Sequence, residues 1–333
     1  LHSRLPTVSF LASAEGCTNR STNQAEALAS CQGFRLVPTG IEPLPIDTVR
    51  PFLDYPRNIH SLGFSFSTNL GAVSWTGEVV YRPNQPLQVD AVDVGFAALQ
   101  PTFPTNSLDF GVVTVPGDRV AIPDYVESIY RNNQNVLPGS KVQGYERFQT
   151  LTYNTSFLFL LGASDNPFGA DQMTLFIEMG AYQIIGLPSL DRLQIAAVGT
   201  EFHHSAGVDG TGTPTPQQTQ DAPDIRLNAH YQASGFATSF SYGYRVLSQL
   251  AYENVLPNVR MAPQFSFFHD VGGRGPLPTA EFNEGRIQAT AGLNTVIDNA
   301  LSTTLRYSWF FGGGLRNPMS DRDTIQLSMS YDF

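Results

Sequence analysis

The sequence predicts an all-β fold, a transmembrane antiparallel β-barrel of the outer-membrane type, with about ten strands in this chain and more in the intact protein. Three observations predict it: apolar and polar residues alternate along many segments, short turns alternate with long loops, and charged residues make up only 14% of the chain. No run of about 18 apolar residues occurs, which excludes a membrane-spanning helix. A membrane protein with this sequence must therefore cross with strands that close into a barrel.

The strand at the end of the chain shows the alternation most clearly. Apolar residues occupy every second position, and these are Ile325, Leu327, Met329, Tyr331 and Phe333. The residues between them are polar, so one face of the strand is apolar and the other is polar. An alternating strand that ends on an aromatic residue is typical of the closing strand of an outer-membrane barrel, in which the apolar face contacts lipid and the polar face lines the lumen.

The same alternation predicts the other strands along the chain. Residues 1–10 contain the end of a strand, and residues 59–70 and 73–81 form a hairpin around a tight turn. Prolines between residues 81 and 86 should stop regular pairing there. Further strands are predicted at 150–159, 173–179, 236–252, 259–267, 287–293 and 301–309.

Loop lengths divide the connections into two groups. Long loops are predicted at about 13–56, 91–140 and 196–233, where no hydrophobic period is sustained. Short turns are predicted near Leu70, Ser164, Leu256 and Asn299, all on the side that carries Phe333. Outer-membrane barrels have short periplasmic turns and long extracellular loops, whereas a soluble sandwich has no reason to separate its loops in this way. We therefore expect residues 1–333 to form a single barrel domain.

Charge and cysteine content limit the partners and suggest a covalent link. The net charge of −10 and the absence of a basic patch argue against a nucleic-acid partner. The only two cysteines, Cys17 and Cys31, stand among polar residues in the first long loop. They are either two free thiols or a disulfide that closes this loop, and export of the protein would favour the disulfide.

If the apolar positions face lipid, charged and amide side chains from successive strands gather on the lumen face. We predict that the pore is lined by Arg245, Arg260, Arg286, Arg306, Glu78, Glu178, Glu253, Gln249 and Gln264, with Gln288 beside them. A mixed wall of arginine and carboxylate sets a transverse field that selects solutes by charge. The alternative is that these pairs only neutralise one another and support the barrel wall or a plug.

No residue pattern supports catalysis, so we predict a protein that is not an enzyme and needs no cofactor or metal. Glu78 and Glu178 lie on different hairpins, which disfavours a glycosidase pair. The histidines at 203–204 lie in a polar loop without a third metal ligand at a useful spacing. The His-Asp pair at 269–270 lacks a nucleophile motif and is interpreted as a hydrogen-bonded pair at the barrel rim. Its aspartate and the charged cluster at 321–323 are interpreted as a salt-bridge network rather than a calcium site.

The second long loop is more apolar than a solvated loop needs to be. Its apolar residues are Phe103, Phe110, Val112, Val113, Val115, Ile122 and Tyr125. The loop either folds inward as a constriction or an apolar entry site, or it packs on the barrel rim.

Several short motifs, taken in order, resemble those of a known outer-membrane family. They are HSRLP at 2–6, DYP at 54–56, GEV at 77–79, YRPN at 81–84, GADQ at 169–172, FHDVGG at 268–273, FNEGR at 282–286, FFGGG at 310–314 and SDRD at 320–323. The ordered set resembles the family named domain of unknown function 1302 over nearly the whole chain. Family members are longer and carry the first motif near their middle, so the resemblance implies that this chain is the C-terminal portion of a barrel completed by N-terminal strands.

The resemblance implies a role in handling hydrophobic compounds such as hydrocarbons, steroids or lipids. Together with the barrel, it predicts a channel or transporter for small hydrophobic organic compounds or lipids in the outer membrane of a Gram-negative bacterium. Two alternatives stay open: a general diffusion porin for polar solutes, and a non-conducting barrel that anchors an envelope lipid-transfer assembly. The expected partners are outer-membrane lipid and lipopolysaccharide, small organic solutes, periplasmic lipid-carrier proteins and the missing N-terminal strands.

Overall fold

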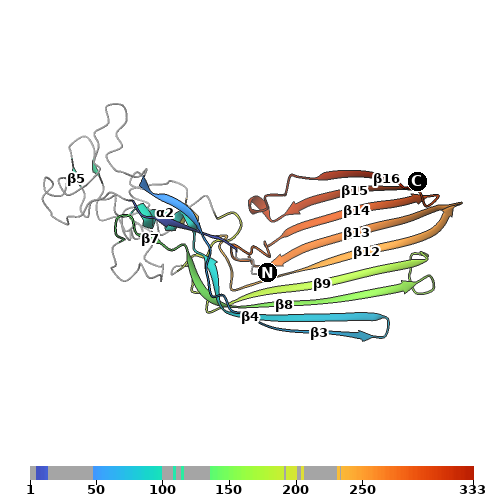
Figure 1. Ribbon diagram of the computed structural model, residues 1–333, viewed down its shortest axis with the longest axis horizontal. Coiled ribbons are helices and arrows are strands. Elements are labelled where there is room, and N and C mark those ends of the chain that lie inside the picture. Colours follow the sequence, from blue (N-terminus) through green and yellow to red (C-terminus); the bar gives the residue numbers. More distant parts are fainter. Residues whose placement is uncertain are drawn as a thin grey trace, which may run out of the picture.

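The computed structural model describes residues 5–13, 48–99, 108–109, 114–115, 136–190, 193–200, 204–205, 231–232 and 234–333. Its main feature is a nine-stranded antiparallel sheet (Figure 1). In chain order the strands are β3 (Leu62–Leu70), β4 (Val73–Gln88), β8 (Tyr145–Gly162), β9 (Gln172–Ile185), β12 (Phe240–Leu256), β13 (Val259–Gly272), β14 (Arg286–Ile297), β15 (Leu301–Gly312) and β16 (Thr324–Tyr331). Each of these strands pairs with the next one in this order, so the sheet is an up-and-down meander.

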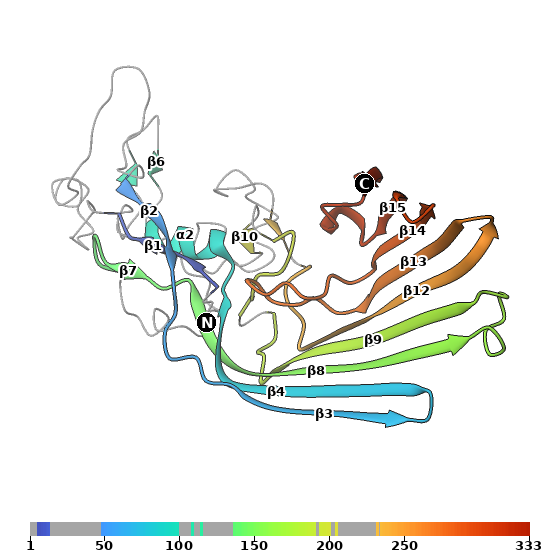
Figure 2. The same cartoon turned by 45° about the vertical axis from the view of Figure 1, so that its right-hand side comes forward.

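The sheet is open. Its edges are β3 and β16, and every side chain of both edge strands is exposed. Figure 2 shows the sheet curving between these edges, which lie apart. The prediction of a large antiparallel β structure is confirmed, but the described strands do not form a closed barrel.

The hairpin turns all lie at one end of the sheet, as the loop lengths predict. In Figure 1 this end, which we call the turn end, is on the right together with the C-terminus. Three of the turns pass through residues with positive φ, namely Gly71 (63°), Asn258 (60°) and Asn299 (56°). Glycine and asparagine tolerate this left-handed conformation, which accounts for their place in the tight turns. The long connections lie at the opposite end, which we call the loop end.

The predicted strands between residues 59 and 333 are all present in the large sheet. The expected break at the prolines of residues 81–86 is wrong, because β4 continues through them to Gln88. The register of β4 against β8 shifts between Arg82 and Gln85. Such a bulge accommodates residues that cannot donate a backbone hydrogen bond, so the strand survives the prolines.

The predicted N-terminal strand exists but belongs to a different sheet. It is β1 (Thr7–Leu11), which pairs with β2 (Arg50–Asp54) and β7 (Lys141–Val142) in a three-stranded sheet at the loop end. Lys141 bridges to Asp54 at 2.6 Å, which connects the outer strands of this sheet across β1. The first strand is therefore part of a small sheet at the loop end, not of the nine-stranded sheet.

A short helix also lies at the loop end, within the range predicted to be an irregular loop. This helix is α2 (Ala91–Leu99), and Asp90 accepts a hydrogen bond from the Val92 N–H at its start, as an N-cap does. The remaining elements are β5 (Leu108–Asp109), β6 (Thr114–Val115), β10 (His204–Ser205), β11 (Tyr231–Gln232) and the 3-10 helix η4 (Gly314–Arg316). Within the described ranges, no helix is long and apolar enough to span a membrane.

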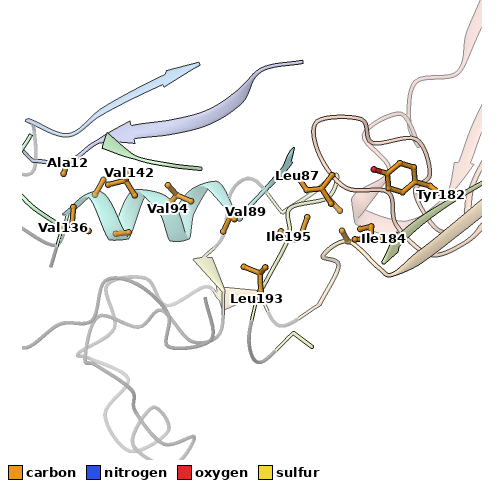
Figure 3. Close-up of a cluster of buried hydrophobic side chains, with 14 residues drawn as sticks. Ala12, Leu87, Val89, Val94, Val136, Val142, Tyr182, Ile184, Leu193 and Ile195 are labelled. Atoms are coloured by element: carbon orange, nitrogen blue, oxygen red, sulfur yellow. The ribbon is translucent and has the colours of Figure 1, made fainter. Parts of the chain in front are cut away.

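The buried hydrophobic core lies at the loop end (Figure 3). It joins the loop-end parts of β4 and β9 to α2 and to the connection that follows β9. Its members include Leu87, Val94, Tyr182, Ile184, Leu193 and Ile195. Apart from this core, both faces of the sheet carry many partly or fully exposed side chains. The sheet is therefore a wall with two surfaces, and the functional question is what each surface faces.

Candidate functional site

All the predicted pore-lining residues lie on one face of the sheet. Residues paired on neighbouring strands point to the same face, and each strand alternates between the two faces. The pairings join Glu178 to Arg245, and Gln249 to Gln264, in two rows of the same face that are separated by the row of Leu247. We call this surface the polar face; it carries Glu78, Glu178, Arg245, Gln249, Glu253, Arg260, Gln264, Arg286, Gln288 and Arg306. Their role in lining a pore stays a prediction.

The opposite surface, the apolar face, exposes large hydrophobic side chains over the same strands. On the edge strands Phe64 is 69% exposed and Ile325 is 73% exposed. Toward the centre, Phe265, Leu293 and Leu305 are also exposed. Water contact with so much hydrophobic surface on one side of a single sheet indicates that another phase or another protein covers it.

Two of the predicted arginines pair with carboxylates along the polar face. Arg245 Nη1 lies 3.6 Å from Glu178 Oε2 on the neighbouring strand, and Asn154 Nδ2 donates to Glu178 Oε1 at 2.9 Å. At the turn end, Arg260 Nε lies 2.9 Å from Glu253 Oε2. The side chains of this second pair are about half exposed, so the pair adds little to stability and mainly balances charge.

A third arginine belongs to a hydrogen-bonded cluster at the loop end, which we call the Asp270 cluster. Arg286 donates from Nε and Nη2 to Asp270 Oδ2, at 2.7 Å in each case. The same carboxylate oxygen accepts the Asn283 backbone N–H at 2.9 Å. Asn283 is buried, and its side chain donates to the Arg316 carbonyl oxygen at 2.7 Å. One carboxylate thus holds the ends of β13 and β14 and the segment between them.

That segment, residues 274–285, folds over the polar face at the loop end, and we call it the inward segment. The ring of Phe282 lies on two glycines of the sheet: a Cβ atom at Gly180 or at Gly243 would be 3.2 Å from it. Backbone hydrogen bonds tie Leu277 to the core connections, since its N–H donates to Ala196 O at 2.8 Å and its oxygen accepts from Gln88 N at 3.0 Å. Glycine in these strands therefore leaves room for the inward segment to dock.

A cavity of about 260 Å³ remains between the inward segment and the sheet. It is lined on the sheet side by Glu178 and Arg245, and on the segment side by Glu281 and Phe282. Burial raises the pKa of the Glu281 carboxyl, and the nearby Arg82 guanidinium partly opposes this shift. A carboxyl group held in this way takes up a proton more readily than one in water.

The last arginine, Arg306, lies in a larger hollow. This hollow, which we call the trough, has a volume of about 670 Å³ and extends over the polar face from β9 to β16. Arg306 Nη2 donates to Gln264 Oε1 at 3.3 Å. The four predicted arginines thus fall into two kinds: three paired with a carboxylate, and Arg306 held by an amide.

Comparison with protein families identifies the chain. A family model described as "Protein of unknown function (DUF1302)" matches residues 1–333. The chain belongs to the DUF1302 family. No curated protein matches the sequence.

Three of the motifs that resemble the DUF1302 family come together in one part of the structure. The motifs at 268–273, 282–286 and 310–314 meet in and around the Asp270 cluster. A Cβ atom added at Gly312 would collide with the Gly285 carbonyl oxygen, and Gly312 has a φ of 73°. These motif residues therefore share one structural task, which is to seat the inward segment against the wall.

Two further interpretations of the DUF1302 sequence are wrong. His269 and Asp270 do not form a rim pair, because consecutive residues of β13 point to opposite faces. The His269 ring packs beside Tyr244 on the apolar face, with ring centroids 5.6 Å apart, while Asp270 binds Arg286 on the polar face. The cluster at 321–323 does not join Asp270 either, since Asp323 instead accepts hydrogen bonds from Phe310 N and Tyr307 Oη.

Several predicted features lie outside the described residues. These are Cys17, Cys31, His203 and most apolar residues of the second long loop; Val115 lies in β6 and His204 in β10. Among the described residues, no group of three or more histidine, cysteine, aspartate or glutamate side chains could hold a metal ion. The inward segment itself was not predicted. The FNEGR motif at 282–286, which resembles a family motif, is the sequence feature that marks this segment.

Proposed function

We propose that this DUF1302 protein is an outer-membrane channel or transporter for small hydrophobic organic compounds or lipids. The asymmetry of the sheet carries this proposal: hydrophobic side chains are exposed on one face, while arginines, carboxylates and amides occupy the other. In a bacterial outer membrane the apolar face would contact lipid and the polar face would enclose the path of the solute.

The lengths of the strands and the free energy of removing the apolar face from water support the proposal that the sheet lies in a membrane. A transmembrane β-strand needs about 9–11 residues. The strands from β4 to β15 have between 12 and 18 residues, so they could cross and extend beyond the hydrocarbon layer. Removing the apolar face from water would stabilise the protein by about 25 cal/mol per Å² of apolar surface. The same surface in water would favour aggregation.

The open edges require a partner in this proposal. Unpaired backbone N–H and C=O groups cost several kcal/mol each in hydrocarbon. We therefore propose that further strands of the same protein pair with β3 and β16 and close the wall, since these are the two edge strands of the sheet. Outer-membrane lipid and lipopolysaccharide would then contact the apolar face, and periplasmic lipid carriers would exchange solutes with the lumen.

A second candidate function is favoured by the inward segment. This segment and the buried core occupy the polar face at the loop end, where they would narrow or block a lumen. A barrel blocked in this way could serve as a non-conducting anchor for an envelope lipid-transfer assembly.

Single-channel conductance of the intact protein in a planar bilayer separates these functions. A hydrophobic-compound transporter should conduct ions weakly, and long-chain hydrocarbon or sterol should change the current. A steady, large conductance that these compounds do not affect would indicate a general diffusion porin instead. Silence under all conditions would indicate the anchor.

Ion selectivity gives the second readout. Arg245→Ala removes one of the positive charges of the polar face, so a pore lined by this face should become less anion-selective. Arg322 is an exposed arginine outside the polar-face ladder, so Arg322→Gln is the matched control. Equal selectivity of both variants and the unmodified protein would contradict the assignment of Arg245 to the pore wall.

A further inference from the structure

Arg306 has no carboxylate partner among the described residues. Of the residues that line the trough in the described ranges it alone is charged, whereas Arg245, Arg260 and Arg286 each lie against a glutamate or aspartate. Its side chain is exposed to the trough, so its charge is available to a bound molecule. An accessible guanidinium without an acidic neighbour is a good site for an anion.

The position of Arg306 is held from two sides. On β14, a Cβ atom at Gly292 would lie 2.9 Å from Arg306 Cγ, so only glycine leaves room for the arginine side chain to lie across this strand. On β13, Gln264 Oε1 accepts a hydrogen bond from Arg306 Nη2. The arginine side chain therefore extends from β15 across β14 to β13. Such positioning reduces the entropy that the side chain loses when it binds a ligand.

The row of side chains next to Arg306 is amphipathic. Hydroxyl groups occupy it on β13 to β15, where Ser266 pairs with Thr290 and Thr290 pairs with Ser308. Thr290 Oγ1 and Ser308 Oγ are 2.8 Å apart. Toward β9 the same row becomes apolar, because Ser266 is followed by Leu247 and then by Phe176. Both of these apolar residues line the same trough.

We propose that the trough binds an amphipathic organic carboxylate, with its carboxylate at Arg306 and its hydrocarbon part over Leu247 and Phe176. The proposal deepens the proposed function, on which it rests, because it names the class of hydrophobic compound that the polar face accepts. The guanidinium supplies two parallel N–H donors to the carboxylate, and the serine and threonine hydroxyls offer further donors. The volume of about 670 Å³ lies within the range of small-molecule sites.

The charged half and the apolar half of the trough each disfavour a ligand that lacks the matching group. A neutral hydrocarbon would give the Arg306 charge no ionic partner and would remove water from this charge at a cost. A small hydrophilic anion would gain nothing from the leucine and phenylalanine, which stabilise only apolar matter. A carboxylate attached to a hydrocarbon chain uses both halves, so it should bind more tightly than either.

Isothermal titration calorimetry of the intact protein held in amphipol tests this inference. Three probes are compared: octanoate, which has head and tail; octan-1-ol, which has the tail alone; and acetate, which has the head alone. We expect octanoate to bind at least about tenfold more tightly than either of the other two. A hydrogen bond to a charged group contributes enough free energy for about this factor in affinity. Octanoate affinity should also fall as salt is added.

Variants separate the two halves of the site. Arg306→Gln should weaken octanoate about tenfold and leave octan-1-ol unchanged, and Arg306→Lys should retain part of the octanoate affinity because the charge remains. Leu247→Ser should weaken octanoate and octan-1-ol alike. Gly292→Ala should act like Arg306→Gln on octanoate, because the added methyl group displaces the arginine stem. Arg322→Gln, outside the trough, should change nothing.

The inference is overturned if octanoate binds Arg306→Gln as tightly as the unmodified protein, or if acetate binds as tightly as octanoate. The binding assay requires no transport. If octanoate binds through Arg306 but no condition gives conductance or uptake, the proposed transport function fails while the carboxylate site stands. If transport of hydrophobic compounds occurs and Arg306→Gln does not alter octanoate binding, the carboxylate site fails while transport stands.

Discussion

The Asp270 cluster should control whether the inward segment stays docked, and Asp270→Asn is the perturbation that tests this. The substitution keeps the shape of the side chain but removes the charge that accepts two hydrogen bonds from Arg286 and one from Asn283. Asp270 is largely shielded from solvent, with 14% of its side chain exposed, whereas Arg286 is 35% exposed. The segment therefore loses its main polar attachment while the packing of Phe282 remains.

The size of the effect follows from these contacts. A hydrogen bond to a charged group contributes about 1.5–3 kcal/mol, and the exposure of Arg286 places this interaction in the lower part of that range. We expect the docked state to lose about 2 kcal/mol, which corresponds to an increase of about 30-fold in the population of the undocked segment.

Hydrogen–deuterium exchange measured by mass spectrometry reports this population directly. The amides of Gly275, Leu277 and Gly285 donate hydrogen bonds within the docked arrangement, so peptides from residues 274–285 should exchange about 30-fold faster in Asp270→Asn. The matched control is Asp321→Asn, which changes an exposed aspartate outside the cluster. Equal exchange of residues 274–285 in the two variants would refute the view that Asp270 holds the segment.

Three further predictions follow from other residues. Because burial raises the pKa of Glu281, the contribution of this residue to the docked state should be complete below the ordinary pKa of glutamate and should be lost as the pH rises through the raised value; Glu281→Gln should remove this part of the pH dependence in exchange rates corrected for intrinsic chemistry. Gly312→Ala should lower the yield of heat-resistant folded protein on gels far more than Gly71→Ala, since both have positive φ but only Gly312 would meet backbone atoms. Cys17 and Cys31 should resist alkylation until a reductant is added; equal labelling without reductant would show free thiols.

Much of the large sheet could be predicted because the pattern that defines each strand lies within a short stretch of sequence. A strand of a two-sided sheet repeats every two residues, so the alternation seen at Ile325, Leu327 and Met329 predicts both the strand and its faces. The same rule predicts Arg245 and Arg306 on one face from the sequence alone, and the register agrees. Which arginine meets which carboxylate depends on strand register, and register is a property of pairs of strands rather than of one segment.

The inward segment could not be predicted because its stabilisation is non-local. Residues 274–285 contain no period of two and no helical period, so by pattern alone they resemble any exposed loop. What places them is the lack of side chains at Gly180 and Gly243, together with one carboxylate on Asp270. A glycine within a strand predicts only that something approaches closely, without saying what approaches.

The contrast between Arg286 and Arg306 shows how one residue type serves two purposes on the same face. Arg286 has its charge satisfied within the protein, and its removal should be detected as a loss of order in the inward segment. Arg306 is positioned by Gln264 and Gly292 but has no acidic partner in the described part of the chain, and its removal should be detected as a loss of ligand affinity at unchanged order. Both side chains lie on neighbouring strands, so a general effect of removing positive charge would act on both readouts equally. Opposite patterns in exchange and calorimetry for Arg286→Gln and Arg306→Gln would therefore separate support of the wall from recognition of the solute.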